Sequence, residues 1–204
     1  MSNSHTHLNI IFFLLLSRGM AFAQEWEFAK EKDGIKIYTR NEPGSHFKCF
    51  KGELDIKADA SVVSSLIEDV ESFAKCDEDV DEIRVLEQVK GKMLTYYVVY
   101  DVPWPFKDRD LCVEATITTN QAEGSIKISA KSVPEAVPLD EDKERITEYW
   151  QNWFIQPGEN NMVHIVLEGF ADPAGEIPAW IANMAITDTP LNMLRAIKET
   201  IESP

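Results

Sequence analysis

The chain has 204 residues, of which 35 are acidic and 20 are Lys or Arg, so its formal net charge is −15 at pH 7. This length is enough for one domain with a substantial core. The strongly negative field repels phosphate, which argues against nucleic acid as a partner and against strong adsorption to anionic lipid.

A short apolar run near the start of the chain is typical of a secretory signal. Residues 8–16 read Leu-Asn-Ile-Ile-Phe-Phe-Leu-Leu-Leu, and the Ala-Phe-Ala pattern at residues 21–23 is typical of a cleavage site. The run is too short to span a bilayer as a helix. We therefore expect residues 1–23 to be a signal peptide and residues 24–204 to be one exported domain, either periplasmic or secreted.

The first part of this domain is predicted to contain two strands and one helix. After a lead-in at residues 26–33, alternation predicts strands at residues 35–40 and 47–56, with Gly52 as a possible bulge. Apolar residues then recur at steps of three and four, which predicts one amphipathic helix over residues 59–76.

A β-rich stretch follows and indicates an antiparallel sheet. Its strands are separated by short turn signals, apart from a charged loop at residues 134–144. The predicted strands lie at residues 83–89, 94–102, 111–119, 125–131, 146–156 and 162–170. Strands in series with short turns favour an antiparallel meander.

The C-terminal part is predicted to be a long helix. Pro178 is well placed in its first turn, and apolar residues recur from Trp180 to Ile201. Pro190 should bend this helix or break its hydrogen bonds locally. The order of elements predicts an α+β helix-grip fold, in which a curved antiparallel sheet wraps around the long C-terminal helix.

The segment at residues 103–110 is the most informative about function. It reads Pro-Trp-Pro-Phe-Lys-Asp-Arg-Asp, and its prolines cannot sit in a central strand because each lacks a backbone donor. The segment must therefore leave the sheet as a loop. Trp104 and Phe106 are costly to leave in water, which favours the rim of a pocket. The alternative is an ordinary strand connection whose aromatic residues cap the core.

No catalytic motif is recognisable in the chain. The patterns of zinc proteases, α/β-hydrolases, P-loop proteins and dinucleotide-binding proteins are missing, so neither a metal nor a cofactor is expected. His46 and His164 each occur singly in a strand pattern, where a structural histidine is the better interpretation. Cys49 and Cys112 are expected to be buried, although one disulfide among the three cysteines stays possible.

Aromatic residues gather in the predicted sheet, its loop and the last helix. Alternation turns about half of those on strands toward the inside of the sheet. Most should belong to the core, but the polar tips of tyrosine and tryptophan would also suit a cavity that receives an amphipathic ligand.

Four segments carry a resemblance to a known family. They are Gly-Ile-Lys-Ile-Tyr at residues 34–38, Trp-Pro-Phe-Lys-Asp-Arg-Asp at 104–110, Ile-Pro-Ala-Trp-Ile-Ala-Asn at 177–183 and Leu-Asn-Met-Leu-Arg at 191–195. On these segments the chain resembles the START domain, the lipid-binding module of the steroidogenic acute regulatory protein family. The resemblance implies a hydrophobic tunnel between the sheet and the C-terminal helix. Family members bind one sterol, phospholipid or ceramide there and need no catalytic residue.

The resemblance also implies that the loop at residues 104–109 borders the tunnel mouth. We expect Trp104 and Phe106 to lie near the C-terminal helix around residues 184–191 and to form a gate. Arg109 should pair with a carboxylate and hold the loop. Sterol-binding members carry an arginine and a carboxylate inside the tunnel, whereas the residues directly after Asp110 read Leu-Cys-Val-Glu-Ala here and include no arginine. The candidate ligand-site residues are Tyr97, Trp104, Phe106, Arg109, Trp153, Trp180, Met184 and Leu191.

The function expected from these features is binding of a lipid or other hydrophobic small molecule, as a carrier in transient contact with a membrane. The alternative is an enzyme of the cyclase or hydrolase type, which would act on an apolar substrate on the same scaffold. Tyr97, His164 or Glu114 would then supply acid–base groups inside the cavity. The position of His164 separates the two functions, because a histidine that faces solvent argues against the enzyme.

Overall fold

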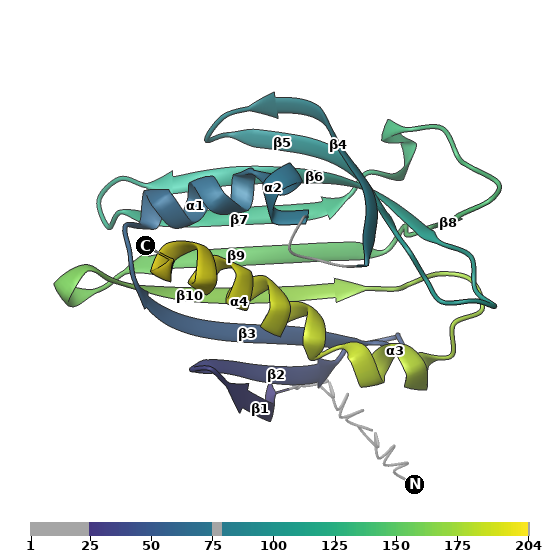
Figure 1. Cartoon of the computed structure of the whole chain (residues 1–204), viewed down its shortest axis with the longest axis horizontal. Helices are drawn as coiled ribbons and strands as arrows, with labels where there is room; N and C mark the ends of the chain where they lie inside the picture. The colour runs from purple at the N-terminus through teal and green to yellow at the C-terminus, as the bar shows by residue number, and fades with distance from the viewer. Residues whose placement is uncertain (1–24, 75–78, 204) are drawn as a thin grey trace, which may run out of the picture.

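A curved, open sheet of ten strands forms the frame of the computed structural model, which describes residues 25–74 and 79–203 (Figure 1). Its strands follow the order β1-β2-β3-β10-β9-β7-β6-β5-β4, and β8 pairs with β6. The pairings are antiparallel, apart from the short parallel pairing of β8 with β6. The strands are β1 (Glu27–Lys32), β2 (Ile35–Asn41), β3 (Lys48–Lys57), β4 (Val80–Val89), β5 (Met93–Tyr100), β6 (Arg109–Asn120), β7 (Ser125–Ser132), β8 (Glu144–Arg145), β9 (Tyr149–Pro157) and β10 (Met162–Ala171).

Helices cover one face of this sheet (Figure 1). In the described ranges they are α1 (Ala60–Glu68), α2 (Val70–Ala74), α3 (Ala179–Ala185) and α4 (Asp188–Glu202). Helix α1 packs on β7 and β9, and α4 packs on β2, β3 and β10. The predicted α+β helix-grip fold is therefore confirmed. The predicted signal peptide at residues 1–23 lies outside the described residues.

The single helix predicted over residues 59–76 is instead two short helices. Helix α1 ends at Asp69, whose ψ of 67° is not helical. The Asp69 carboxylate accepts a hydrogen bond from the Ser72 backbone amide at 3.1 Å, so this residue also caps the start of α2. The apolar period continues across the break, which is why the sequence pattern predicted one helix. Residues 75–76 of the prediction lie outside the described residues.

The C-terminal helix is interrupted near Pro190, as predicted. The interruption lies before the proline, between α3 and α4, so Pro190 occupies the first turn of α4. A proline ring clashes with the carbonyl group four residues earlier, here Ile186, which prevents one continuous helix through this point. In a first turn the missing N–H group costs little, because the first N–H groups of a helix have no carbonyl partner within that helix.

Gly52 does not form the predicted bulge. It pairs in regular register with Ile37 of β2 and with Leu167 of β10. A Cβ atom at this position would lie 2.6 Å from Leu194 Cδ1 and 3.3 Å from Pro190 Cβ. The glycine therefore lets α4 approach the middle of the sheet closely.

Two strands were missed by the sequence pattern. Strand β1 lies at the sheet edge, where five of its six residues are exposed and only Lys30 is half-buried, so no alternation marks it. Strand β8 is two residues long and lies at the end of the predicted charged loop. The other predicted strands are all present.

The sheet has an apolar core on each face. The larger core lies between the sheet and the helices and includes Trp153 and Leu194. A smaller one on the opposite face contains Tyr97, Val99 and Cys112. Cys49 and Cys112 are buried with free thiols, while Cys76 lies outside the described residues. No helix in the described part of the chain is long and apolar enough to cross a membrane.

Candidate ligand cavity

A cavity of about 300 Å³ lies between the inner face of the sheet and the helices. Its walls come from β3, β4, β5, β6, β7, β9 and β10, and from α1, α2 and α4. Most of the lining side chains are apolar; they include Phe50, Ile67, Phe73, Ile83, Leu94, Val98, Leu111, Ala115, Ile128, Ala130, Ile146, Trp153, Ile186 and Met193. This volume lies at the lower end of the range for small-molecule sites.

Strand alternation selects the residues that line the cavity. Along β5, Leu94, Tyr96, Val98 and Tyr100 face it, whereas the residues between them do not. Successive side chains of a strand point to opposite faces, so every second residue lies on the same wall. On β9 the same rule brings Tyr149, Gln151 and Trp153 to the cavity.

Trp153 is held in place by its indole nitrogen. Its Nε1 donates a hydrogen bond to Gln151 Oε1 at 3.0 Å, and the Gln151 amide nitrogen lies 3.6 Å from Met193 Sδ on α4. The Phe73 ring of α2 packs edge-on against the indole, with 6.4 Å between the ring centroids. These contacts tie β9 to α2 and α4 across the cavity.

Two tyrosine hydroxyl groups meet in the cavity wall. Tyr96 of β5 and Tyr149 of β9 are hydrogen-bonded to each other, although their strands are not neighbours in the sheet. Burial raises the pKa of Tyr96 to about 12 and raises the pKa of Tyr149 well above its usual value. Both groups therefore stay neutral at physiological pH.

The charged groups that line the cavity are acidic. Glu68 and Asp79 are the charged residues among its described lining, which contains no Lys, Arg or His. The Glu68 carboxylate accepts hydrogen bonds from the Ser64 hydroxyl and from the Gly91 backbone amide, each at 2.9 Å. Within the described part of the chain, no group of acidic, histidine or cysteine side chains could hold a metal ion.

No family model matches the chain. It is 30% identical to the solved structure of residues 25–204 of a STAR-related lipid transfer protein from Xanthomonas axonopodis. The match covers 87% of this chain and 99% of that one, with a TM-score of 0.79. The chain belongs to the START family. It is also 32% identical over 184 residues to PA1579, an uncharacterized protein of Pseudomonas aeruginosa, with 90% of each chain covered.

A human relative shares the fold at lower identity. Human StAR-related lipid transfer protein 5 is 16% identical to this chain, with a TM-score of 0.70, and the match covers 87% of this chain and 88% of that one. The START fold of this protein, with its apolar cavity, is a hydrophobic ligand-binding fold.

Of the predicted ligand-site residues of this START domain, Trp153 lines the cavity. Leu191 is buried in the adjacent core without being part of the lining. Tyr97 lies on the opposite face of the sheet, where its hydroxyl donates to Asp110 at 3.2 Å. Tyr97 could therefore contact a ligand directly only if the ligand bound on that opposite face of the sheet and not in the cavity.

The other predicted aromatic and helix residues lie toward solvent. Trp104 is 91% exposed, Trp180 is 66% exposed and Met184 is 72% exposed, while Phe106 is half-buried. None of these four side chains lines the cavity. Their loop, between β5 and β6, and helix α3 lie at the same end of the sheet (Figure 1). The gate formed by Trp104 and Phe106 stays a prediction.

Arg109 holds the loop, but through backbone carbonyl groups. Its guanidinium donates to the carbonyl oxygens of Lys107, of Pro173 at 3.0 Å and of Ala174 at 3.2 Å. Burial lowers the pKa of this guanidinium, while nearby Glu144 opposes that shift. The expected carboxylate pair is therefore replaced by bonds that tie the loop before β6 to the segment before α3.

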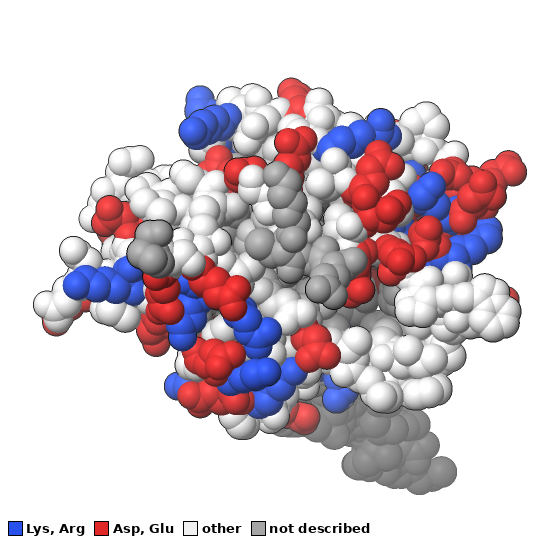
Figure 2. Space-filling model, in the orientation of Figure 1, with Lys and Arg blue, Asp and Glu red and all other residues white. Residues whose placement is uncertain are grey.

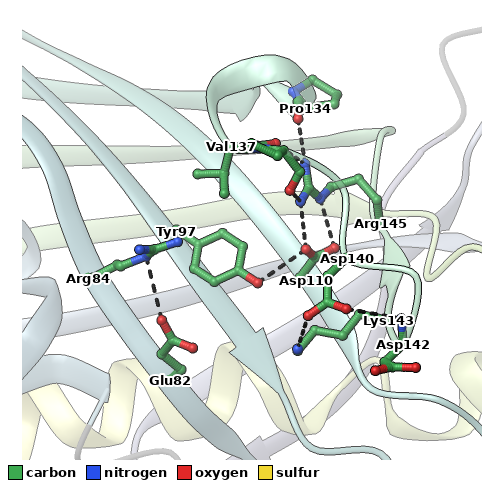
Figure 3. Close-up of polar contacts among 11 residues, drawn as sticks. Glu82, Arg84, Tyr97, Asp110, Pro134, Val137, Asp140, Asp142, Lys143 and Arg145 are labelled. Atoms are coloured by element: carbon green, nitrogen blue, oxygen red, sulfur yellow. Dashed lines mark hydrogen bonds and ion pairs between the residues drawn. The ribbon is translucent and has the colours of Figure 1, made fainter.

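The buried ion pair of this region belongs to the neighbouring residue, Asp110 (Figure 3). Arg145 of β8 binds its carboxylate at two points, with Nε–Oδ1 at 2.7 Å and Nη2–Oδ2 at 2.6 Å. Both side chains are almost completely buried. Arg145 also donates to the carbonyl groups of Pro134, Val137 and Pro138, which uses all five of its N–H donors. This bidentate pair fastens the loop after β7 to the outer face of the sheet.

The acid–base candidates of the enzyme alternative do not meet in the cavity. His164 lies on the outer face of β10, 40% exposed, with its Nδ1 at 2.8 Å from Asp55 Oδ1. Glu114 pairs with Lys131 at 3.2 Å, and Tyr97 faces Asp110. The interpretation of His164 as a structural residue is consistent with this position.

Sequence reasoning missed most of the polar groups in the cavity. Tyr96, Tyr100, Tyr149 and Gln151 all line it, but none was among the candidates. The alternation of β5 could have identified two of them. Tyr96 and Tyr100 alternate with the apolar residues Leu94 and Val98, so all four lie on the same face of the strand. On β9, Gln151 and Tyr149 likewise lie two and four residues before Trp153, so they share its face of the strand.

Proposed function

We propose that this START domain carries a lipid or another apolar small molecule in the cavity between its sheet and α4. The observation that carries the proposal is the apolar lining of a 300 Å³ cavity in a member of this family. Each methylene group that moves from water into such a cavity gains about 0.8 kcal/mol, so an acyl or polyisoprenoid chain would bind without charge attraction. Carriage of this kind requires no catalytic group.

Loading from a membrane is the second part of the proposal. Trp104, Trp180 and Met184 are large, exposed apolar side chains on the β5–β6 loop and α3, at one end of the sheet. The surface over α3 is mostly uncharged, in contrast to the charged surface over α4 (Figure 2). Exposed apolar patches on soluble proteins are rare and often mark interaction sites. This end would contact lipid transiently, and its apolar side chains suit an uncharged bilayer better than an anionic one.

Export is the third part of the proposal. It rests on the apolar run at residues 8–16 and the Ala-Phe-Ala pattern at residues 21–23. N-terminal sequencing of the protein purified from its native host should begin at Gln24. Recovery of the intact N-terminus from the cytosolic fraction would contradict export without affecting the carrier function.

Native mass spectrometry tests the carrier function. The protein is stripped of bound molecules under mild conditions and mixed with a total lipid extract, and the mass of any 1:1 complex identifies the ligand class. We expect one bound apolar molecule per chain. If no lipid, sterol or apolar small molecule is retained by the folded protein, the proposed function is wrong.

A further inference from the structure

Among the described residues that line the cavity, hydroxyl and amide groups are present but no basic group is. The hydroxyl groups come from Tyr96, Tyr100, Tyr149 and Thr189, and the amides from Gln151 and Asn192. The Gln151 oxygen already accepts the Trp153 N–H. The charged lining residues are the acids Glu68 and Asp79. A phosphate or carboxylate in this cavity would find no cation among the described lining, and burial of such a charge without a partner is costly.

The tyrosine pair has bonding capacity left over. Two phenolic groups carry two O–H donors and the lone pairs of two oxygens, and the bond between Tyr96 and Tyr149 uses one donor and one acceptor site. The remaining donor and lone pairs sit at the cavity wall, because both side chains line it. An incoming hydroxyl or carbonyl group could therefore accept from one tyrosine and, for a hydroxyl, donate to the other.

The high pKa of both tyrosines agrees with this electrostatic character. Burial disfavours the phenolate form of each side chain, as it would disfavour any other unpaired anion at this place. The size of the cavity adds a second limit, because about 300 Å³ suits one short chain or a small ring system better than a two-chain phospholipid.

From these observations we infer that the Tyr96–Tyr149 pair is a polar recognition site of the cavity and selects a neutral, single-chain-sized ligand that bears a hydroxyl or carbonyl group. The inference rests on the proposed function, since it assumes that the cavity binds an apolar molecule. It assigns this chain a recognition group formed by two tyrosines on β5 and β9, in a cavity whose described lining has no arginine.

Competition binding with matched probes tests the inference. The protein is loaded with 1,6-diphenylhexatriene, a fluorophore without polar atoms, which is then displaced by 1-decanol or by decanoate. We expect 1-decanol to compete at least tenfold better than decanoate. Tyr149→Phe and Tyr96→Phe should each weaken decanol binding about three- to tenfold, the effect of losing one hydrogen bond. They should change the affinity for diphenylhexatriene, which forms no hydrogen bond, by a smaller factor.

Tyr97→Phe is the matched control, because it removes a tyrosine hydroxyl from the same strand on the opposite face. It should not change decanol binding, and melting temperatures should show that all three variants are folded. The inference is wrong if decanoate competes as well as decanol, if decanol fails to displace the fluorophore, or if both cavity variants bind decanol like the wild type. Failure of diphenylhexatriene to bind the wild type would instead contradict the proposed function.

Discussion

Tyr96 and Tyr97 are adjacent in β5, yet their hydroxyl groups lie on opposite faces of the sheet. The Tyr96 hydroxyl meets Tyr149 at the ligand cavity, while the Tyr97 hydroxyl donates to the buried Asp110 carboxylate on the outer face. The Arg84 guanidinium covers the Tyr97 ring, 4.8 Å from its centroid (Figure 3). One strand thus contributes a candidate recognition group to one face and a structural bond to the other.

The Asp110–Arg145 pair should be important for stability. Arg145→Met would remove the guanidinium that binds the Asp110 carboxylate and three carbonyl groups in a buried site. Loss of one partner of a buried ion pair costs about 3–5 kcal/mol, because the other charge remains unmatched. Urea denaturation should show this loss in the free energy of unfolding.

Lys131→Met provides the matched control for this experiment. It removes a lysine from the exposed ion pair with Glu114 and should change the free energy of unfolding by less than about 1 kcal/mol. Equal stabilities of the two variants would show that the Arg145 bonds contribute no more than a surface contact.

The close packing of α4 on β3 should make Gly52 sensitive to substitution. Gly52→Ala would place a methyl group 2.6 Å from Leu194 Cδ1, and overpacking of this kind typically costs about 1–3 kcal/mol. In a Leu194→Ala background the same substitution should cost much less, since the clashing side chain is gone. A double-mutant cycle by denaturant unfolding measures the difference, and strictly additive costs would contradict the close approach.

The overall architecture could be predicted because long segments had clear periods. The strands of the central sheet alternate and the helices repeat every three to four residues, so their type and order followed from the sequence. Strand β1 could not be found this way, because an exposed edge strand has no buried side. The role of Gly52 depends on Leu194 and Pro190, which are distant in sequence, so a local pattern suggested a bulge instead.

The candidate site was predicted less well than the fold. Tyr97 and Trp104 were predicted as ligand-site residues because they are aromatic. Whether an aromatic residue lines the cavity depends instead on which face of its strand it occupies and on how close it lies to the cavity. The ion pair of Asp110 with Arg145 spans 35 residues of sequence. Asp110 follows Arg109 directly in the sequence. An ion pair was therefore predicted in the right place, but its arginine is Arg145 and not Arg109.

The exposed tryptophan of the β5–β6 loop should affect ligand exchange more than stability. Trp104→Ser removes a side chain that is 91% exposed, so the free energy of unfolding should change by no more than about 0.5 kcal/mol. Transfer of a fluorescent lipid between phosphatidylcholine vesicles should nevertheless slow severalfold if this loop contacts the bilayer. An unchanged transfer rate would remove the loop from the loading mechanism.

The buried tyrosines should make the fold sensitive to alkaline pH. Burial raises the pKa of both Tyr96 and Tyr97 from 10.0 to about 12. Because the folded state binds these protons more tightly than the unfolded state, their contribution to stability is complete below pH 10 and is lost as the pH rises through about 12. Absorbance at 295 nm should show these phenols ionising near pH 12 or together with unfolding. Ionisation of every tyrosine near pH 10 in the folded protein would contradict their burial.

The central claim is that an apolar ligand binds inside the cavity, and a cavity-filling substitution tests it most directly. Ala130 lines the cavity and Ala122 lies in an exposed turn, so Ala130→Phe and Ala122→Phe add the same group inside and outside. Fluorescence titration with diphenylhexatriene should give one site per wild-type chain and per Ala122→Phe chain, and at least tenfold weaker binding to folded Ala130→Phe. Wild-type affinity in folded Ala130→Phe would show that the ligand binds elsewhere.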